Sequence, residues 1–158
     1  MRSLKPTDMP ALKKVLAALN RAGSFTSEEV DCALELLNIF LDRPDQKDYL
    51  VLVAEKAGTP VGFVLYGPVP LTSGTFDVYW IATAPEVQGE GYGRRLMAAA
   101  EEDMKRRGAR MICLETASKE SYRRTRAFYD AAGYVQESVI RDFYVPGDDR
   151  ITYVKRFS

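Results

Sequence analysis

The sequence Gln88-Gly89-Glu90-Gly91-Tyr92-Gly93 lies between a run of aromatic and β-branched residues, Thr75–Thr83, and a segment of helical periodicity that ends before Gly108. Its three glycines allow the backbone to turn tightly and to approach a ligand closely. The helix after it would begin with unpaired N–H groups and the positive end of its dipole. A strand, a glycine-rich loop and a helix in this order predict a phosphate-binding site.

The sequence motifs of two common phosphate-binding loops do not match this segment. A Walker loop ends in Gly-Lys followed by Ser or Thr, and no such ending occurs here. A dinucleotide fingerprint that starts at Gly89 or Gly91 would need a third glycine at position 94 or 96, where Arg94 and Leu96 stand. The predicted phosphate site is therefore of another type.

The rest of the chain predicts one domain, residues 1–158, of the α/β class with a mixed sheet flanked by helices. Helical spacing of apolar residues alternates with strand-like runs and turn signals, which gives the order β-α-α-β-β-β-α-β-α-β-β. We expect Thr7 or Asp8 to cap the first helix and Thr26 to form a capping box with Glu29. In chain order we predict a strand at 1–4, a helix that Gly23 ends, a helix that ends before Pro44, strands at 49–55, 61–66 and 75–83, the helix after the glycine loop, a strand at 110–116, a helix at about 121–132, and strands around 134–144 and 150–157.

Composition limits the function classes. The 158 residues include 22 basic and 22 acidic side chains, so the chain has no broad attraction for nucleic acid or an anionic membrane, and we expect neither as a partner. There is no histidine, which argues against histidine triads and the usual zinc sites, and we expect no metal. No apolar run approaches the length of a membrane span, so we expect a cytoplasmic protein. Cys32 and Cys113 are expected to be small buried residues.

The glycine loop resembles the Q/R-x-x-G-x-G/A signature of the GNAT family of N-acetyltransferases. The preceding Ile81-Ala82-Thr83-Ala84-Pro85 is similar to that family's Leu-x-Val-x-Pro, and Phe128–Tyr134 resembles its F-Y-x-x-x-G-F/Y. The predicted element order also equals the fold of that family. The resemblance covers nearly the whole chain and is weakest over the two N-terminal helices.

The resemblance implies that the protein binds acetyl-coenzyme A. The backbone of one strand would contact the pantetheine arm, and N–H groups from Gln88 to Arg94 would hold the pyrophosphate. Tyr122 and Thr125 depart from the Asn and Ala that the family often has there, so the amide contact to the cofactor at those places is open. The residues expected to contact the cofactor are Ile81, Ala82, Thr83, Gln88, Gly89, Glu90, Gly91, Tyr92, Gly93, Arg94, Tyr122, Thr125 and Phe128.

The same resemblance assigns two catalytic residues. Tyr129 aligns with the family tyrosine that gives a proton to the departing coenzyme A thiolate. Asp77 lies where some members place a catalytic carboxylate, and it would take the proton of an ammonium acceptor directly or through a water. Strand alternation predicts that Asp77, Tyr79, Ile81 and Thr83 share one face.

The expected reaction is transfer of an acetyl group from coenzyme A to a primary amine, without a metal. Phe25, Tyr79 and Tyr144 are candidates for the acceptor pocket because they fall near the ends of elements that flank the site. The acceptor itself, a small molecule or a peptide, is not determined by the sequence. A sensor module that binds acyl-coenzyme A without catalysis is the alternative, and the C-terminal strands could pair across a two-fold axis in a homodimer.

Overall fold

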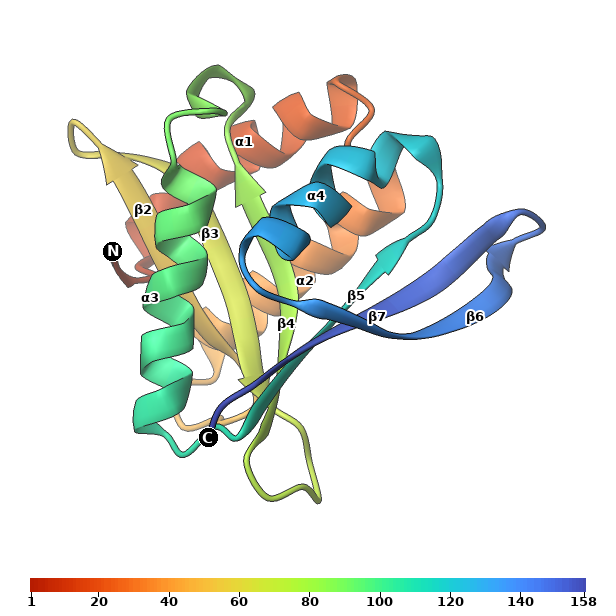
Figure 1. Ribbon diagram of the computed structural model, residues 1–158. Helices are drawn as coiled ribbons and strands as arrows, with labels where there is room; N and C mark the ends of the chain where they lie inside the picture. Colours follow the sequence, from red (N-terminus) through yellow and green to blue (C-terminus); the bar gives the residue numbers. More distant parts are fainter.

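The computed structural model describes residues 1–158 and has one seven-stranded mixed sheet of order β1-β2-β3-β4-β5-β7-β6. All neighbouring strands are antiparallel except β4 and β5, which are parallel. The predicted element order and fold class are confirmed (Figure 1). The elements are β1 (Arg2–Ser3), α1 (Met9–Arg21), α2 (Ser27–Asp42), β2 (Leu50–Lys56), β3 (Thr59–Pro68), β4 (Thr75–Thr83), α3 (Tyr92–Arg106), β5 (Met111–Ala117), α4 (Arg123–Ala131), β6 (Val135–Val145) and β7 (Asp148–Arg156), with single 3-10 turns at Pro6–Asp8, Pro85–Val87 and Glu120–Tyr122.

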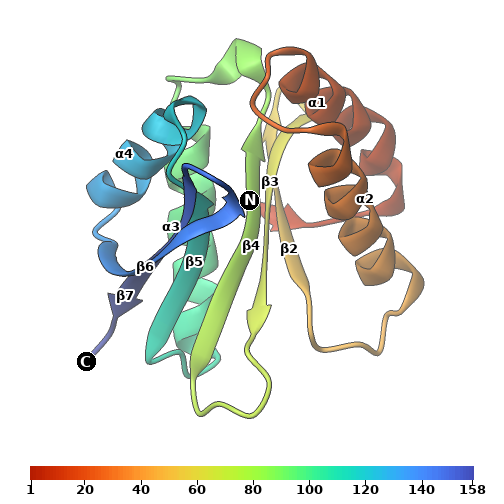
Figure 2. The ribbon, with the colours of Figure 1, turned by 90° about the vertical axis from the view of Figure 1, so that its right-hand side faces the viewer.

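The helices form two layers, one on each face of the sheet. Figure 2 shows α1 and α2 on one face and α3 and α4 on the other. We call these the α1/α2 face and the α3/α4 face. Fully buried apolar side chains fill the space below both layers, among them Leu16 and Leu37 on the first and Leu96 and Met104 on the second. The sheet is therefore covered on both faces, as its buried, apolar interior strand β3 requires.

The start of α1 differs from the prediction. Neither Thr7 nor Asp8 caps α1 with its side chain, because a 3-10 turn, Pro6–Asp8, runs directly into the helix. The Asp8 carboxylate instead accepts hydrogen bonds from the Lys5 N–H at 2.8 Å and from the Arg2 guanidinium at 2.7 and 2.8 Å. The Arg2 guanidinium holds the pKa of this buried carboxyl below its usual range. Asp8 thus ties β1 to the first turn of the chain.

The start of α2 follows the prediction. The Glu29 N–H donates to the Thr26 hydroxyl at 3.1 Å, and the Thr26 N–H donates to the Glu29 carboxylate at 2.7 Å. This reciprocal pair is the predicted capping box. The expectation for Cys32 on the same helix is wrong, since its side chain is exposed, and Cys113 is only partly buried. Helical periodicity placed Cys32 beside apolar positions, but α2 turns that side of the helix to solvent.

Strand β6 forms one edge of the sheet and is exposed along its whole length. With β7 it makes a hairpin that extends away from the body of the molecule (Figure 1). Its exposed apolar side chains are Val135, Val139, Ile140, Phe143, Tyr144 and Val145. Such an edge offers unpaired backbone groups to another strand.

Gly67 on β3 is a point where only glycine fits. A Cβ atom there would overlap the carbonyl oxygen of Asp48, which passes behind the strand. We expect Gly67→Ala to lower the free energy of unfolding by about 3 kcal/mol, because a backbone segment cannot move aside as a side chain can. Urea denaturation measures this loss.

Gly23→Ala serves as the control for that substitution. A Cβ at Gly23 meets nothing within 4 Å, and the cost there comes from its φ of +77°. We expect Gly23→Ala to lower the free energy of unfolding by about 1 kcal/mol, because alanine is strained in this left-handed conformation. Equal losses for the two variants would mean that the crowding at Gly67 is relieved at little cost.

Candidate active site

The candidate site is a cleft where the parallel strands β4 and β5 separate. The two strands pair only from Thr75 to Asp77, opposite Met111 to Cys113, and diverge beyond these residues. The cleft has a volume of about 1580 Å³. Pockets for single small ligands usually measure roughly 300–1,000 Å³, so this one has room for two reactants.

The glycine loop forms one end of the cleft and offers a set of free backbone donors. Gly89 and Gly91 both have φ near +86°, and Gly91 is the N-terminal cap of α3. The first N–H of the helix with a backbone acceptor belongs to Arg95, which donates to the Gly91 carbonyl at 3.1 Å. The N–H groups without an acceptor are those of Gly89, Gly91, Tyr92, Gly93 and Arg94. Five such donors at a helix N-terminus make an anion-binding surface.

Two residues of the predicted loop behave differently. The N–H groups of Gln88 and Glu90 are already used within turns, where they donate to Pro85 and Val87. Gln88 still lines the cleft, but Glu90 does not, and its carboxylate pairs with the Lys56 ammonium at 2.8 Å. Glu90 lies between Gly89 and Gly91, whose positive φ angles turn the chain on both sides of it. We therefore remove Glu90 from the candidate contacts.

All the other predicted cofactor contacts lie together along the cleft. Arg94 and Arg124 supply positive charge there, and sequence reasoning missed Arg124 because nothing in its spacing distinguishes it from the other arginines of α4. The neighbouring Arg95 stacks over the Tyr92 ring at 4.3 Å from the centroid. The predicted cofactor contacts that line the cleft are Ile81, Ala82, Thr83, Gln88, Gly89, Gly91, Tyr92, Gly93, Arg94, Tyr122, Thr125 and Phe128.

Strand β4 has a bulge in the middle of the site. Leu65 of β3 lies opposite Trp80 and the next residue, Tyr66, lies opposite Val78, so Tyr79 is the extra residue on β4. A bulge of this kind changes which face the following side chains point to. The predicted alternation from Asp77 to Thr83 is therefore wrong.

Register assigns each side chain to a face, because directly opposed residues in an antiparallel pair point the same way. The Tyr66 hydroxyl donates to Asp103 of α3 at 2.7 Å, so Tyr66 marks the α3/α4 face. Ile81 and Thr83 share that face, since they pair with residues at even spacing from Tyr66. Asp77 pairs with the residue after Tyr66 and points to the α1/α2 face.

The other residues of the bulge also turn to the α1/α2 face. The Trp80 ring meets Phe25, from the loop between α1 and α2, edge to face at 5.4 Å. Tyr79 meets Tyr49 at 5.6 Å in the same kind of contact. Asp77, Phe25, Tyr79 and Trp80 thus form one wall of the cleft, and Tyr49 lies outside it. The bulge separates this wall from the strand residues that face α3.

Asp77 is a half-buried carboxyl without a hydrogen-bond or ion-pair partner on its side chain. Burial, and then the nearby Glu115 carboxylate, raise the pKa of Asp77 above its usual range. Burial and the negative charge of Asp77 raise the pKa of Tyr79 to about 12. A carboxylate with a raised pKa binds a proton more tightly, which suits a general base.

Tyr129 lies on the opposite face, on α4, and is almost fully buried while lining the cleft. Its ring packs between Phe128, Tyr134 and Tyr153 at 5.6 to 6.2 Å. Burial raises the pKa of the Tyr129 phenol above its ordinary value. The hydroxyl therefore keeps its proton at neutral pH and has no partner within the protein that would compete for it.

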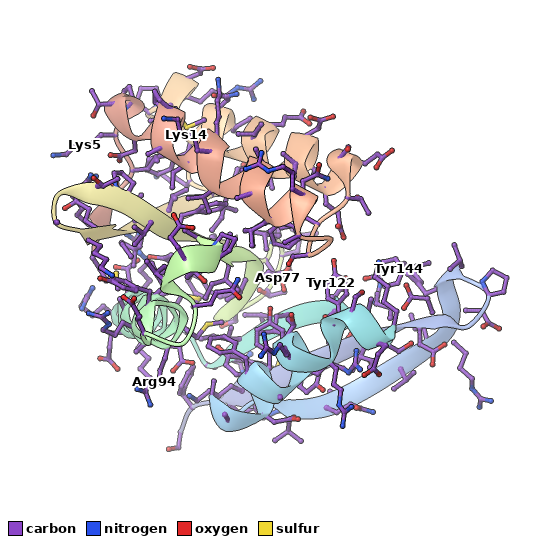
Figure 3. The ribbon with its side chains drawn as sticks, turned by 90° about the horizontal axis from the view of Figure 1, so that it is seen from above. Lys5, Lys14, Asp77, Arg94, Tyr122 and Tyr144 are labelled. Atoms are coloured by element: carbon purple, nitrogen blue, oxygen red, sulfur yellow. The ribbon has the colours of Figure 1, made fainter.

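Tyr122 and Tyr144 lie at the other end of the cleft. Figure 3 shows both in the space between the α1/α2 layer and α4, with Arg94 at the α3 side and Asp77 between it and the two tyrosines. The Tyr122 hydroxyl donates to the Glu29 carboxylate at 2.8 Å. Burial, and then this bond, raise the pKa of Tyr122. Sequence reasoning assigned Glu29 only to the helix cap.

No cluster of three or more potential metal-ligating side chains occurs in the structure. None of its helices combines the length and apolar character that crossing a bilayer would demand. The site contains backbone amides, aromatic rings, several carboxylates and three cationic side chains, those of Arg94, Lys119 and Arg124.

A split parallel strand pair with an amide-lined glycine loop at a helix N-terminus gives this mixed α/β protein a site that suits an extended anionic ligand. The sequence of residues 15–134 matches the model of the acetyltransferase (GNAT) family. The chain belongs to this family. No curated protein matches it significantly in sequence.

Solved structures agree with this membership. A Desulfovibrio desulfuricans protein assigned to the GNAT family is 37% identical, with a TM-score of 0.92 over 99% of this chain and 96% of that one. The ribosomal-protein-S18-alanine N-acetyltransferase of Escherichia coli is 20% identical, with a TM-score of 0.76 over 99% and 92%. The PaiA N-acetyltransferase of Thermoplasma acidophilum, solved with coenzyme A, is 21% identical, with a TM-score of 0.77 over 99% and 97%. The last two share the fold with this chain.

Proposed function

We propose that this protein transfers an acetyl group directly from acetyl-coenzyme A to a primary amine. The observation that carries the proposal is the placement of Asp77 and Tyr129 on opposite faces of the gap between β4 and β5. A base on one side and an acid on the other suit an acceptor and a leaving group that meet between them. The direct transfer needs no covalent enzyme intermediate.

The cofactor would lie along the gap. The five free amides from Gly89 to Arg94 would bind the pyrophosphate, with Arg94 and Arg124 adding charge. The backbone of Ile81 to Thr83 borders the gap where β4 has lost its neighbour β5, so its polar groups are available to the pantetheine arm. Thr125 and Phe128 of α4 would cover the other side.

Proton transfers complete the reaction. An alkylammonium of pKa about 10.4 must lose a proton near pH 7, which costs about 4.6 kcal/mol. Asp77 would accept that proton, directly or through a water, and the amine nitrogen would bond to the acetyl carbonyl carbon. The carbon–sulfur bond then breaks, and Tyr129 would give its proton to the sulfur. The nitrogen would lose its second proton at the same stage, and that proton would restore the Tyr129 phenol through water. The same burial that raises the pKa of Tyr129 also raises that of a buried thiol, so the transfer stays feasible.

The acceptor pocket is proposed to lie on the α1/α2 face, between Phe25, Tyr79 and Tyr144. The Escherichia coli neighbour is by its name an enzyme that acts on an alanine of a ribosomal protein. That name supports an amine acceptor and leaves small amines and peptides equally open for this chain.

Titration calorimetry with acetyl-coenzyme A, together with coenzyme A thiol release over a panel of primary amines, tests the proposal. The panel comprises a polyamine, an aminoglycoside, an amino acid, a free peptide N-terminus and a lysine peptide. We expect binding, and turnover of at least one amine. Binding without any turnover would favour the sensor module, and absence of binding would reject both functions.

Gly91→Asp is the matched control for that test. It places a negative charge among the free amides and a side chain at a φ of +86°. We expect it to abolish binding of acetyl-coenzyme A. The aspartate carboxylate would repel the cofactor pyrophosphate, and the backbone of an aspartate would be strained at this positive φ. Unchanged binding would remove the loop from the cofactor site.

Two further expectations stay proposals. The exposed edge of β6 would suit pairing with a second copy across a two-fold axis, which sedimentation equilibrium measures. Two unpaired cysteines suit a reducing compartment, and we propose the cytoplasm.

A further inference from the structure

One hydrogen bond crosses the open side of the cleft. The Tyr122 hydroxyl, just before α4, donates to the carboxylate of Glu29 in the first turn of α2, a residue 93 positions earlier. Both residues are half-buried and both line the cleft. The bond therefore joins two walls of the site rather than two points within one wall.

The two parts of the molecule on either side of the gap are connected differently on the two faces. On the α3/α4 face, Glu101 of α3 bonds to Tyr134 at 3.0 Å and to Lys155 at 2.9 Å. On the α1/α2 face, the bond between Tyr122 and Glu29 is the only hydrogen bond or ion pair from α1 or α2 to the part that follows β4. Beyond Asp77 the strands give no connection, because they have separated.

Both ends of this bridge are held in place. One Glu29 oxygen accepts from Tyr122 while the other accepts from the Thr26 N–H, so the capping box fixes the carboxylate. The Lys119 ammonium lies 5.0 Å from the centre of the Tyr122 ring. Thr26 directly follows Phe25, whose ring packs on Trp80 of the bulge. The bridge is thus tied to the same wall that carries Asp77.

We propose that Tyr122 is a positioning residue for the acceptor, and that its bond to Glu29 holds the α1/α2 side of the cleft at the width at which an amine meets Asp77. This inference rests on the proposed amine acetylation. Tyr122 is also a predicted cofactor contact, but its hydroxyl is bound to Glu29, and this bridge lies at the end of the cleft away from the free loop amides. The bond therefore acts on the acceptor, while any contact of the Tyr122 ring with coenzyme A is kept when phenylalanine replaces tyrosine. The hydrogen bond fixes the width of the cleft, and the negative charge of Glu29 is not needed to bind the acceptor.

Two substitutions separate the bond from the charge. Tyr122→Phe removes the hydroxyl and keeps the ring. Glu29→Gln removes the charge and one of the two acceptor oxygens. The amide oxygen can keep the capping bond from the Thr26 N–H, and the amide NH2 can donate to the Tyr122 oxygen, so the bridge is kept with donor and acceptor exchanged. Tyr49→Phe is the matched control, because the Tyr49 hydroxyl makes no hydrogen bond and the residue lies outside the cleft.

The kinetic test uses acetyl-coenzyme A and whichever amine of the panel turns over fastest. We expect Tyr122→Phe to raise the KM for the amine about tenfold, the lower part of the range for a hydrogen bond to a charged group. The Kd for acetyl-coenzyme A should stay within about twofold, and Glu29→Gln and Tyr49→Phe should stay within about threefold in KM. A large effect of Glu29→Gln with little effect of Tyr122→Phe would overturn the proposal and assign Glu29 as a charge partner of the acceptor.

Amide hydrogen exchange tests the bridge without any acceptor. We expect Tyr122→Phe to speed exchange at residues 24–30 and 118–124, with the core strands β3 and β4 unchanged. Equal exchange in the variant and the parent protein would overturn the proposal even if amines are acetylated. Failure of every amine in the panel, with faster exchange in the variant, would instead count against the proposed function and leave the bridge established as a closure of the cleft.

Discussion

Asp77→Asn is expected to lower kcat/KM for the amine by about 100-fold, at the lower end of what general-base catalysis contributes. The asparagine amide keeps the shape of the side chain but cannot accept the ammonium proton at neutral pH. Because the pKa of Asp77 is raised, this carboxyl ionises above its usual pH range, and the activity of the parent protein should rise with pH over that range. The pH–rate profile of the variant should lack this rise. A pH–rate profile measured with the best amine of the panel checks this.

The same substitution is expected to stabilise the protein at neutral pH. A carboxyl whose pKa is raised on folding binds its proton more tightly in the folded state, so its contribution to stability falls as pH rises from the unfolded value through the folded one. Asparagine removes that loss. Thermal unfolding at neutral pH should give a higher Tm for the variant, and the difference should shrink in acid. Lower activity together with a lower Tm would point to a folding defect, and an unchanged pH profile would assign the base to water or another group.

Tyr129→Phe is expected to reduce kcat by about 100-fold while the Kd for acetyl-coenzyme A changes little. The phenol hydroxyl has no partner in the protein, so its removal leaves no buried group unpaired and should not lower the Tm. Single-turnover measurement of thiol release isolates the chemical step from product release.

Tyr153→Phe is the control for Tyr129. The Tyr153 ring packs 5.9 Å from that of Tyr129, is equally buried, and lies outside the cleft. We expect this variant to keep the parent kcat. If both variants lose activity to the same degree, the aromatic cluster acts through packing and Tyr129 is not the proton donor.

Local sequence determined much of this protein. The glycine loop, the capping box at Thr26 and the order of elements depend on residues within a few positions of one another, and glycine conformation, capping and side-chain period act over that range. The structure has all three where the sequence predicts them, and the family membership follows from the same motifs.

Only the tertiary structure decided which face each side chain of the site points to and which distant segments meet there. The bulge at Tyr79 depends on the register of β4 against β3, and it sends Asp77 to one face and Ile81 to the other. The bond between Tyr122 and Glu29 depends on where two segments 93 residues apart meet. Glycine spacing located the glycine loop at the helix N-terminus. The proposed acceptor side of the site depends on strand register and on contacts between distant elements, which a local sequence pattern does not contain.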